Sequence, residues 1–195
     1  MNTAAYFEQI YQHPDPFQYR DRWYEARKRA LTLASLPRQR YRNGWELGCS
    51  NGVLTAELAA RCDALLATDL SAAALAEASV STQAHANVRL QQASHPDQWP
   101  QGQFDLIVVS EVGYYLSPQD VVTMATQLRG SLADDGLLLA CHWVHPFAEA
   151  RTSAAQVHRA FARGLEEAFF YQDADMLLQG WSAEPVSVAR WEGLR

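Results

Sequence analysis

Four residues in the stretch WELGCSNGVLT, residues 45–55, have types and spacing that could bind a ligand. Glu46 precedes a bend that contains Gly48, Ser50 and Gly52, and an apolar helical pattern follows the bend. Glycine lets the backbone turn sharply and approach a ligand closely, and the free amides at the start of the next helix favour a negative group. The stretch therefore predicts a nucleotide-type pocket, and the surrounding charges indicate which ligand it binds.

Two phosphate ligands fit this bend poorly. A triphosphate-binding loop ends in a Lys-Ser or Lys-Thr pair, which this stretch lacks. A dinucleotide fingerprint has glycines at its first, third and sixth positions, where this chain has Gly48, Ser50 and Val53. An acid at Glu46 instead suits a zwitterion, whose carboxylate would meet the helix amides and whose ammonium would meet the acid.

Asp69 predicts the rest of the ligand. It ends the apolar run ALLATD, residues 64–69, and follows Gly52 by 17 residues. At the end of a second parallel strand, a carboxylate can accept hydrogen bonds from two ribose hydroxyls, although an acid at this position can also simply precede a helix. An amino acid joined to an adenosine is S-adenosylmethionine, so we expect this cofactor.

The order of apolar runs predicts the elements that must position these residues. From Arg42 onward, strand-like runs alternate with helical patterns, which is typical of a doubly wound α/β fold with a mostly parallel sheet. Seven strands are expected, at residues 44–49, 64–69, 87–92, 104–110, 137–142, 166–172 and 175–181. Helices are expected at residues 53–62, 72–79, 118–132 and 155–163. The last two strands are close enough in sequence to form a terminal antiparallel hairpin.

The composition favours one globular domain over residues 1–195. Of the 195 residues, 48% are hydrophobic and 19% charged, a balance that allows a sizeable core. Residues 1–40 are expected to form a helical lid or flank of that domain, with Trp23, Ala26 and Leu33 on the apolar face of its helix, together with Ala30. No long apolar run or basic leader is present, so we expect a cytoplasmic protein that makes no membrane contact. The three cysteines are expected to be reduced thiols.

The first motif resembles that of the class I S-adenosylmethionine-dependent methyltransferases, which has the form acid-x-Gly-x-Gly-x-Gly. The segment ELGCSNG keeps Glu46, Gly48 and Gly52 and has Ser50 in place of the middle glycine. The resemblance implies a Rossmann-like fold and further cofactor contacts. These are Leu70 beside Asp69, Ala93 and Ser94 beside the adenine, and Ser110 and Glu111 beside the methionine moiety.

A narrower resemblance extends from about Asp15 to the end of the chain. The segments WYEARKRALTLASLPRQRY, ELGCSNGVLTAELAARCDALLATDLS, FDLIVVSEVGYYL and HWVHP carry it. They are similar to the nodulation protein S (NodS-like) methyltransferases, whose namesake N-methylates the free amine of a partly deacetylated chito-oligosaccharide. The resemblance implies an enzyme that N-methylates a small or sugar-derived amine, with an amino sugar or oligosaccharide as its partner.

Glu111 and His142 are the candidate catalytic residues. An amine at pH 7 is mostly protonated, and a carboxylate or imidazole near the methyl group could accept its proton. Both residues follow central strands, but Glu111 could instead cap a turn and His142 could be a hydrogen-bonded structural histidine. Tyr24, Tyr114, Tyr115 and His145 are candidate acceptor contacts, for which simple packing is the alternative. His142 and His145 have no third ligand indicated, so no metal is expected.

Other functions remain open at the level of sequence. An O-methyltransferase would need a stronger base near the methyl group, and a non-catalytic module could bind S-adenosylmethionine without turnover. A nicotinamide oxidoreductase is disfavoured by the glycine spacing. The segment from Arg20 to Arg42 has eight basic and two acidic residues in a chain of net charge −6. It could attract nucleic acid, but the chain lacks the Asn/Asp-Pro-Pro-aromatic signature of many base methylases.

Overall fold

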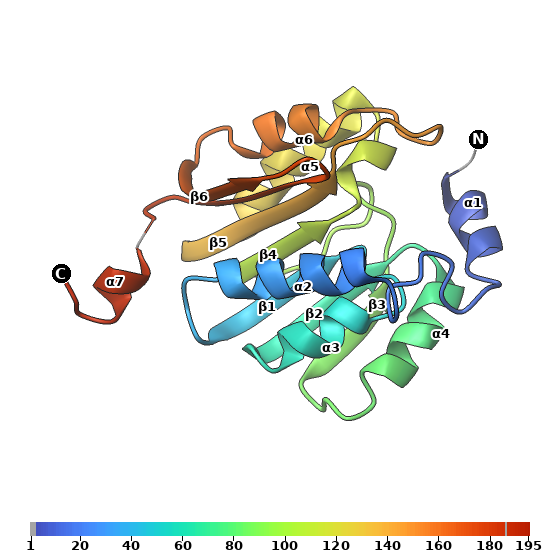
Figure 1. Cartoon of the computed structure of the whole chain (residues 1–195), viewed down its shortest axis with the longest axis horizontal. Helices are drawn as coiled ribbons and strands as arrows, with labels where there is room; N and C mark the ends of the chain where they lie inside the picture. Colours follow the sequence, from blue (N-terminus) through green and yellow to red (C-terminus); the bar gives the residue numbers. More distant parts are fainter. Residues whose placement is uncertain (1–2, 186) are drawn as a thin grey trace. The chain divides into compact units, whose positions relative to one another are not determined.

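The computed structural model describes residues 3–185 and 187–195 and contains a seven-stranded mixed sheet (Figure 1). The strand order is β3-β2-β1-β4-β5-β7-β6. Two compact units make up the chain, the first ending at Trp99 and the second beginning at Pro100. The doubly wound, mostly parallel sheet predicted from the sequence is thereby confirmed.

The described residues of the first unit, from Thr3 to Trp99, form three parallel strands and four helices. The strands are β1 (Tyr41–Leu47), β2 (Cys62–Asp69) and β3 (Val88–Gln92). The helices are α1 (Thr3–Ile10), α2 (Trp23–Ser35), α3 (Val53–Ala59) and α4 (Ala72–Ser81). In the strand register Leu47 lies beside Thr68, and Asp69 lies beside Gln92. The carboxyl ends of the three strands therefore meet at one edge.

The second unit, over residues 100–185 and 187–195, forms four strands and the remaining helices. The strands are β4 (Phe104–Ser110), β5 (Leu132–Trp143), β6 (Glu166–Gln172) and β7 (Met176–Ser182). The helices are the 3₁₀ turn η1 (Gly113–Tyr115), α5 (Pro118–Ser131), α6 (Ala154–Phe161) and α7 (Val188–Trp191). β4 and β5 are parallel, whereas β7 is antiparallel to both β5 and β6. The predicted C-terminal hairpin is confirmed.

Helix starts follow the capping residues in the sequence. The Ser117 hydroxyl accepts a hydrogen bond from the Asp120 amide at 3.1 Å, and Pro118 provides the first helical position of α5. The Ser71 hydroxyl accepts one from the Ala74 amide at the start of α4, at 3.2 Å. These caps fix where both helices begin.

Strand β5 is longer than predicted. The sequence predicted a helix that ends at residue 132 and a strand that begins at residue 137, yet β5 begins at Leu132. Phe104 pairs with Leu132 and Leu106 with Leu137, so the intervening residues of β5 form an irregularity in the ladder. The exposed acids Asp134 and Asp135 occupy it, because a bulge leaves residues outside the ladder pairing.

The predicted inward face of α2 was wrong. Trp23 is 76% exposed, and the buried residues of α2 are Glu25, Lys28 and Thr32. The helix therefore turns a polar stripe inward. A 2.8 Å ion pair between Lys28 and Glu25 offsets part of the cost of burying these charges. Two aromatic rings also lie near the ammonium, those of Tyr19 and Tyr24.

Gly52 allows helices α3 and α4 to pack closely at the edge where the three strands end. Its φ is +77°, and a Cβ built on it would lie 2.7 Å from the Ala78 Cα. Any larger residue would have to adopt a left-handed conformation and push α4 away. Both requirements are met only by glycine.

We expect Gly52→Ala to destabilise the protein by about 2–4 kcal/mol, from backbone strain together with overpacking. The matched control is Gly130→Ala, because Gly130 lies in α5 and a Cβ added there would meet nothing within 4 Å. The control should be neutral or stabilising by about 1 kcal/mol. Urea denaturation measures both. Equal stability of the two variants would contradict the packing argument.

Candidate cofactor and acceptor sites

The loop after β1 holds three residues in the left-handed conformation. Gly48 has φ +77°, Ser50 +53° and Gly52 +77°. A serine at positive φ is unusual, and it stands where the family motif has its middle glycine. Ser50 adopts the glycine-like conformation because its neighbours hold it there, so the substitution preserves the shape of the loop.

Asp69 is the residue that holds this loop. One carboxylate oxygen accepts a 2.9 Å hydrogen bond from the Ser50 amide, and the other accepts one of the same length from the Ser71 amide. Asp69 is only 8% exposed, and burial raises its pKa while the amide hydrogen bonds oppose the rise. A carboxylate has about four acceptor positions, so Asp69 can hold the loop and still accept from ribose hydroxyls.

Glu46 is a buried acid with an unsatisfied oxygen. Its side chain is 2% exposed, and among the described residues Oε2 has no hydrogen-bond partner. Burial raises the pKa of Glu46 to about 8, and the nearby Asp69 charge adds to the rise. A buried acceptor without a partner costs about 1–3 kcal/mol. A donor that carries positive charge would remove this cost.

The N-terminal segment covers the same loop. The Tyr11 hydroxyl lies 2.5 Å from the Ser50 hydroxyl, and the Asn51 amide donates to Asp15 at 3.0 Å. The Ser71 hydroxyl also donates to Glu8 of α1. Helix α1 and the chain after it are therefore attached directly to the cofactor loop and to the start of α4.

Leu70, Ala93 and Ser94, which are expected around the adenosine, differ in their distance from Asp69 and in their burial. The Ala93 amide donates to the Asp69 carbonyl at 2.9 Å, and the Gln92 side chain donates to the Leu70 carbonyl at 3.0 Å. Ala93 is buried, whereas Ser94 is exposed and donates through its amide to Gln98. Leu70 and Ala93 therefore lie beside Asp69, and Ser94 lies at the surface.

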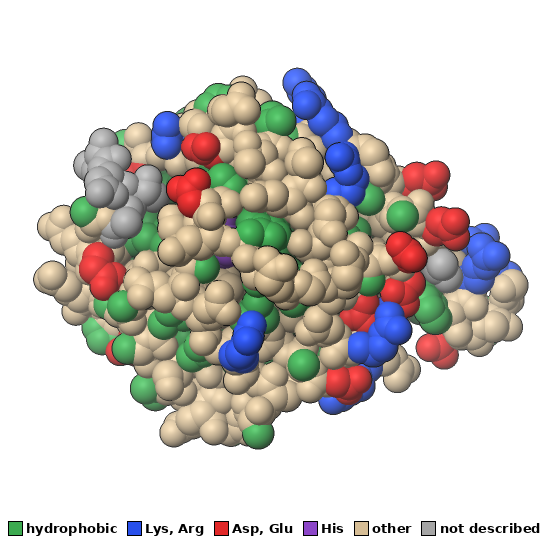
Figure 2. Space-filling view, turned by 180° about the vertical axis from the view of Figure 1, so that it is seen from behind, with side chains coloured by type: hydrophobic (Ala, Val, Ile, Leu, Met, Phe, Trp, Pro, Cys, Tyr) green, Lys and Arg blue, Asp and Glu red, His purple; other side chains and the backbone are tan. Residues whose placement is uncertain are grey.

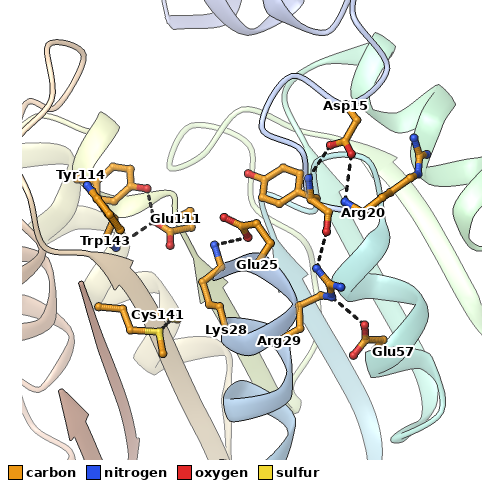
Figure 3. Close-up of polar contacts among 12 residues, drawn as sticks. Asp15, Arg20, Glu25, Lys28, Arg29, Glu57, Glu111, Tyr114, Cys141 and Trp143 are labelled. Atoms are coloured by element: carbon orange, nitrogen blue, oxygen red, sulfur yellow. Dashed lines mark hydrogen bonds and ion pairs between the residues drawn. The ribbon is translucent and has the colours of Figure 1, made fainter. Parts of the chain in front are cut away.

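Glu111 follows the end of β4 in a strained conformation (Figure 3). Its φ is +59°, which is uncommon for a residue with a side chain and is often found at functional sites. The Trp143 amide donates to Glu111 Oε2 at 3.1 Å, and the Tyr114 hydroxyl donates to the same oxygen. Ser110 precedes it as the last residue of β4.

His142 and Tyr114 lie close to each other, while the other predicted acceptor contacts are more exposed. The Tyr114 and His142 rings are 5.2 Å apart, and His142 is fully buried. Tyr115 is half-buried against Tyr114. His145 is exposed and lies 3.0 Å from Asp175. Tyr24 belongs to the other unit, where its ring lies near Lys28.

Four of the eight basic residues between positions 20 and 42 form ion pairs with acids inside the first unit. Arg20 pairs with Glu77 and Arg29 with Glu57. Arg40 pairs with Asp63 in the same way, and Lys28 with Glu25. These four pairs neutralise part of the positive charge that the sequence concentrates in residues 20–42. On the face opposite to the view of Figure 1, which Figure 2 draws, basic and acidic side chains are also interspersed.

Two further findings concern the described part of the chain. None of the helices there has both the length and the apolar character needed to cross a membrane. Within residues 3–185 and 187–195, no group of three or more His, Cys, Asp or Glu side chains is arranged to hold a metal ion.

Comparison with known proteins identifies the class. A family model described as a methyltransferase domain matches residues 45–138. A crystal structure of a protein from Pseudomonas syringae, itself only provisionally assigned as a methyltransferase, is 45% identical. That match covers 83% of this chain and 99% of the other, with a TM-score of 0.73. The chain belongs to the class I S-adenosylmethionine-dependent methyltransferases.

Two structures with S-adenosylhomocysteine are also similar. The N-methyltransferase NodS from Bradyrhizobium japonicum WM9 is 26% identical, with 93% of this chain and 98% of that chain covered and a TM-score of 0.82. DhpI is 18% identical, with coverage of 94% and 96% and a TM-score of 0.76, and shows the fold alone. The comparison with curated proteins found no match.

The residues present fit S-adenosylmethionine. The unsatisfied Glu46 Oε2 suits the ammonium of the methionine moiety, and Asp69 suits the ribose. The sequence predicted both acids, the three loop residues and Glu111. It did not predict Tyr11 or Asp15, because nothing in their spacing links them to the loop that they contact.

We expect Glu46→Gln to stabilise the ligand-free protein while weakening cofactor binding. A carboxyl whose pKa is raised on folding loses stability as the pH rises from its unfolded value, 4.5, toward about 8. The gain from removing its charge should be about 1–4 kcal/mol at pH 8 and much smaller at pH 5. Affinity for S-adenosylhomocysteine should fall at least tenfold, about 1.4 kcal/mol.

Denaturation at the two pH values and calorimetry measure these effects. The matched control is Glu57→Gln in α3, because the exposed carboxylate of Glu57 pairs with Arg29. This variant should change the affinity for S-adenosylhomocysteine by less than about twofold and the free energy of unfolding by less than about 1 kcal/mol. Unchanged ligand affinity in Glu46→Gln would contradict the assignment of Glu46.

Proposed function

We propose that the protein transfers the methyl group of S-adenosylmethionine to the nitrogen of a small or sugar-derived amine. The observation that carries the proposal is Glu111, a strained residue after β4 whose carboxylate is oriented by two donors. The similarity to the N-methyltransferase NodS supports an amine acceptor. The two units, whose strands belong to one sheet, would then act as a single methyltransferase domain.

The first unit would bind the cofactor. Glu46 accepts from the ammonium, the loop residues Gly48, Ser50 and Gly52 leave backbone close to the ligand, and Asp69 accepts from the ribose. Leu70, Ala93 and Ser94 would flank the adenine. The sulfonium of the cofactor supplies a methyl group that is already activated for displacement, so the protein has mainly to align the acceptor.

The second unit would prepare the acceptor. An amine must lose a proton to attack, and a carboxylate within hydrogen-bonding reach can take that proton and orient the lone pair. We assign this role to Glu111. The hydrogen bonds from Trp143 and Tyr114 fix Oε2 in one orientation, which keeps the carboxylate from swinging away from the acceptor.

His142 is less suited to accept the proton. Its Nε2 accepts a 3.0 Å hydrogen bond from the Gly113 amide, and its Nδ1 lies 3.0 Å from His158 Nε2. Both ring nitrogens are therefore used inside the protein, and His142 is fully buried. Tyr114, Tyr115, Tyr24 and His145 remain proposed acceptor contacts.

We expect Glu111→Gln to lower turnover about a hundredfold or more, the usual contribution of a general base. Affinity for S-adenosylhomocysteine should change by less than about threefold, because the other cofactor contacts are intact. Transfer from methyl-labelled S-adenosylmethionine to glucosamine oligomers, simple amines and neutral sugars measures turnover, and calorimetry measures affinity.

Glu166→Gln is the control, because it makes the same change on an exposed residue of β6 and should leave turnover unchanged. Normal turnover in Glu111→Gln would remove Glu111 from the mechanism. Transfer to neutral sugars alone would replace the amine acceptor by a hydroxyl. Tight cofactor binding without transfer to any acceptor would favour a binding module.

A further inference from the structure

A series of hydrogen bonds leads from the buried turn that follows Glu111 to the protein surface. The Gly113 amide donates to His142 Nε2 at 3.0 Å, and His142 Nδ1 lies 3.0 Å from His158 Nε2. His158 Nδ1 lies 2.7 Å from the Gln179 side-chain oxygen. The Gln179 amide nitrogen then donates to Glu167 Oε2 at 3.1 Å. These hydrogen bonds connect five elements in turn, which are η1, β5, α6, β7 and β6.

The direction of every bond follows from its first donor. A backbone amide can only donate, so His142 Nε2 must accept and His142 Nδ1 must carry the hydrogen. His158 Nε2 then accepts and His158 Nδ1 carries its hydrogen, which it donates to Gln179. Both rings are therefore neutral Nδ1–H tautomers. Burial lowers the pKa of His158 to about 4, consistent with a neutral ring.

This series of hydrogen bonds holds Gly113 in place and does not conduct protons. An amide N–H is far too weak an acid to transfer its proton to an imidazole, so the hydrogen bonds cannot relay a proton from Gly113 to His142. The same turn is also packed tightly, because a Cβ on Gly113 would lie 2.4 Å from Val157 Cγ1. Val157 and His158 are neighbours on α6, so this helix packs on the turn through Val157 and is linked to it by hydrogen bonds through His158 and His142.

Glu111 needs such support because of its backbone. A non-glycine residue at φ +59° costs of order 1–3 kcal/mol unless the surroundings hold it. The Glu111 amide is tied to the Cys141 carbonyl at 2.9 Å, one residue before His142. The Gly113 amide is tied to His142 itself. Two successive residues of β5 thus hold the two ends of the strained turn.

We propose that His158, acting through His142, is a positioning residue for Glu111. It accepts the His142 Nδ1 hydrogen, and so presents His142 Nε2 as the acceptor that holds Gly113. His158 does not touch the reacting atoms. The inference rests on the proposed role of Glu111 in methyl transfer, and two of its tests do not depend on that role.

The decisive variant is His158→Leu, which removes the acceptor for His142 and keeps a buried side chain of similar size. We expect turnover to fall at least tenfold, with affinity for S-adenosylhomocysteine within twofold of the wild type. Hydrogen exchange at the Gly113 amide should accelerate at least tenfold. His158→Gln keeps an oxygen that can accept a hydrogen bond from His142. This variant should recover much of the turnover and much of the protection of the Gly113 amide from exchange.

The wild-type protein provides a test that needs no variant. Nitrogen-15 NMR of the imidazole rings should show the Nδ1–H tautomer for His142 and His158. The matched control is Arg159→Leu, the next residue on α6, which is exposed and should alter neither turnover nor Gly113 exchange.

Three results would overturn the proposal. They are an Nε2–H tautomer of His142 in the wild type, unchanged Gly113 exchange in folded His158→Leu, and unchanged turnover in that variant. If His158→Leu does not fold, His158→Gln and the wild-type tautomers decide the question. Normal turnover in Glu111→Gln would instead reject the proposed function, and the tautomer and exchange results would still judge the hydrogen-bond chain.

Discussion

Two backbone amides that donate to one carboxylate hold the cofactor region together. Asp69 accepts from Ser50 in the loop after β1 and from Ser71 at the start of α4. Without these bonds, Ser50 would have little reason to keep the left-handed conformation that its place in the motif requires. Asp69 thus joins the loop to the start of α4, and the N-terminal segment binds to both.

The arrangement places two acids in a buried region, which is unfavourable for the protein alone. Glu46 lies near Asp69, and burial with this second charge raises the pKa of Glu46 to about 8. Removing such a charge should stabilise the ligand-free chain, and we therefore propose that the pair serves to bind a ligand. A ligand that presents an ammonium to one acid and hydroxyls to the other satisfies both, and S-adenosylmethionine is such a ligand.

Local patterns predicted the fold correctly, and they singled out the two acids that the structure buries near each other. Apolar runs predicted the strands, and the capping residues Ser117 and Ser71 predicted where two helices begin. The spacing from Gly52 to Asp69 indicated the second acid. The inward face of α2 could not be predicted, because an ion pair and two tyrosine rings outweigh its apolar residues there. His158 was also missed, since a hydrogen bond to His142 depends on packing between α6 and β5 that no spacing reveals.

The most direct test of the account is the proton count when S-adenosylhomocysteine binds. Because Glu46 is expected to be largely protonated at pH 7 without ligand and ionised beside the ammonium, binding should release about one proton. Calorimetry in buffers of different ionisation enthalpy measures this number for the wild type and for Glu46→Gln. The account predicts about one proton released by the wild type and close to none by the variant. Equal proton release in both proteins would contradict it.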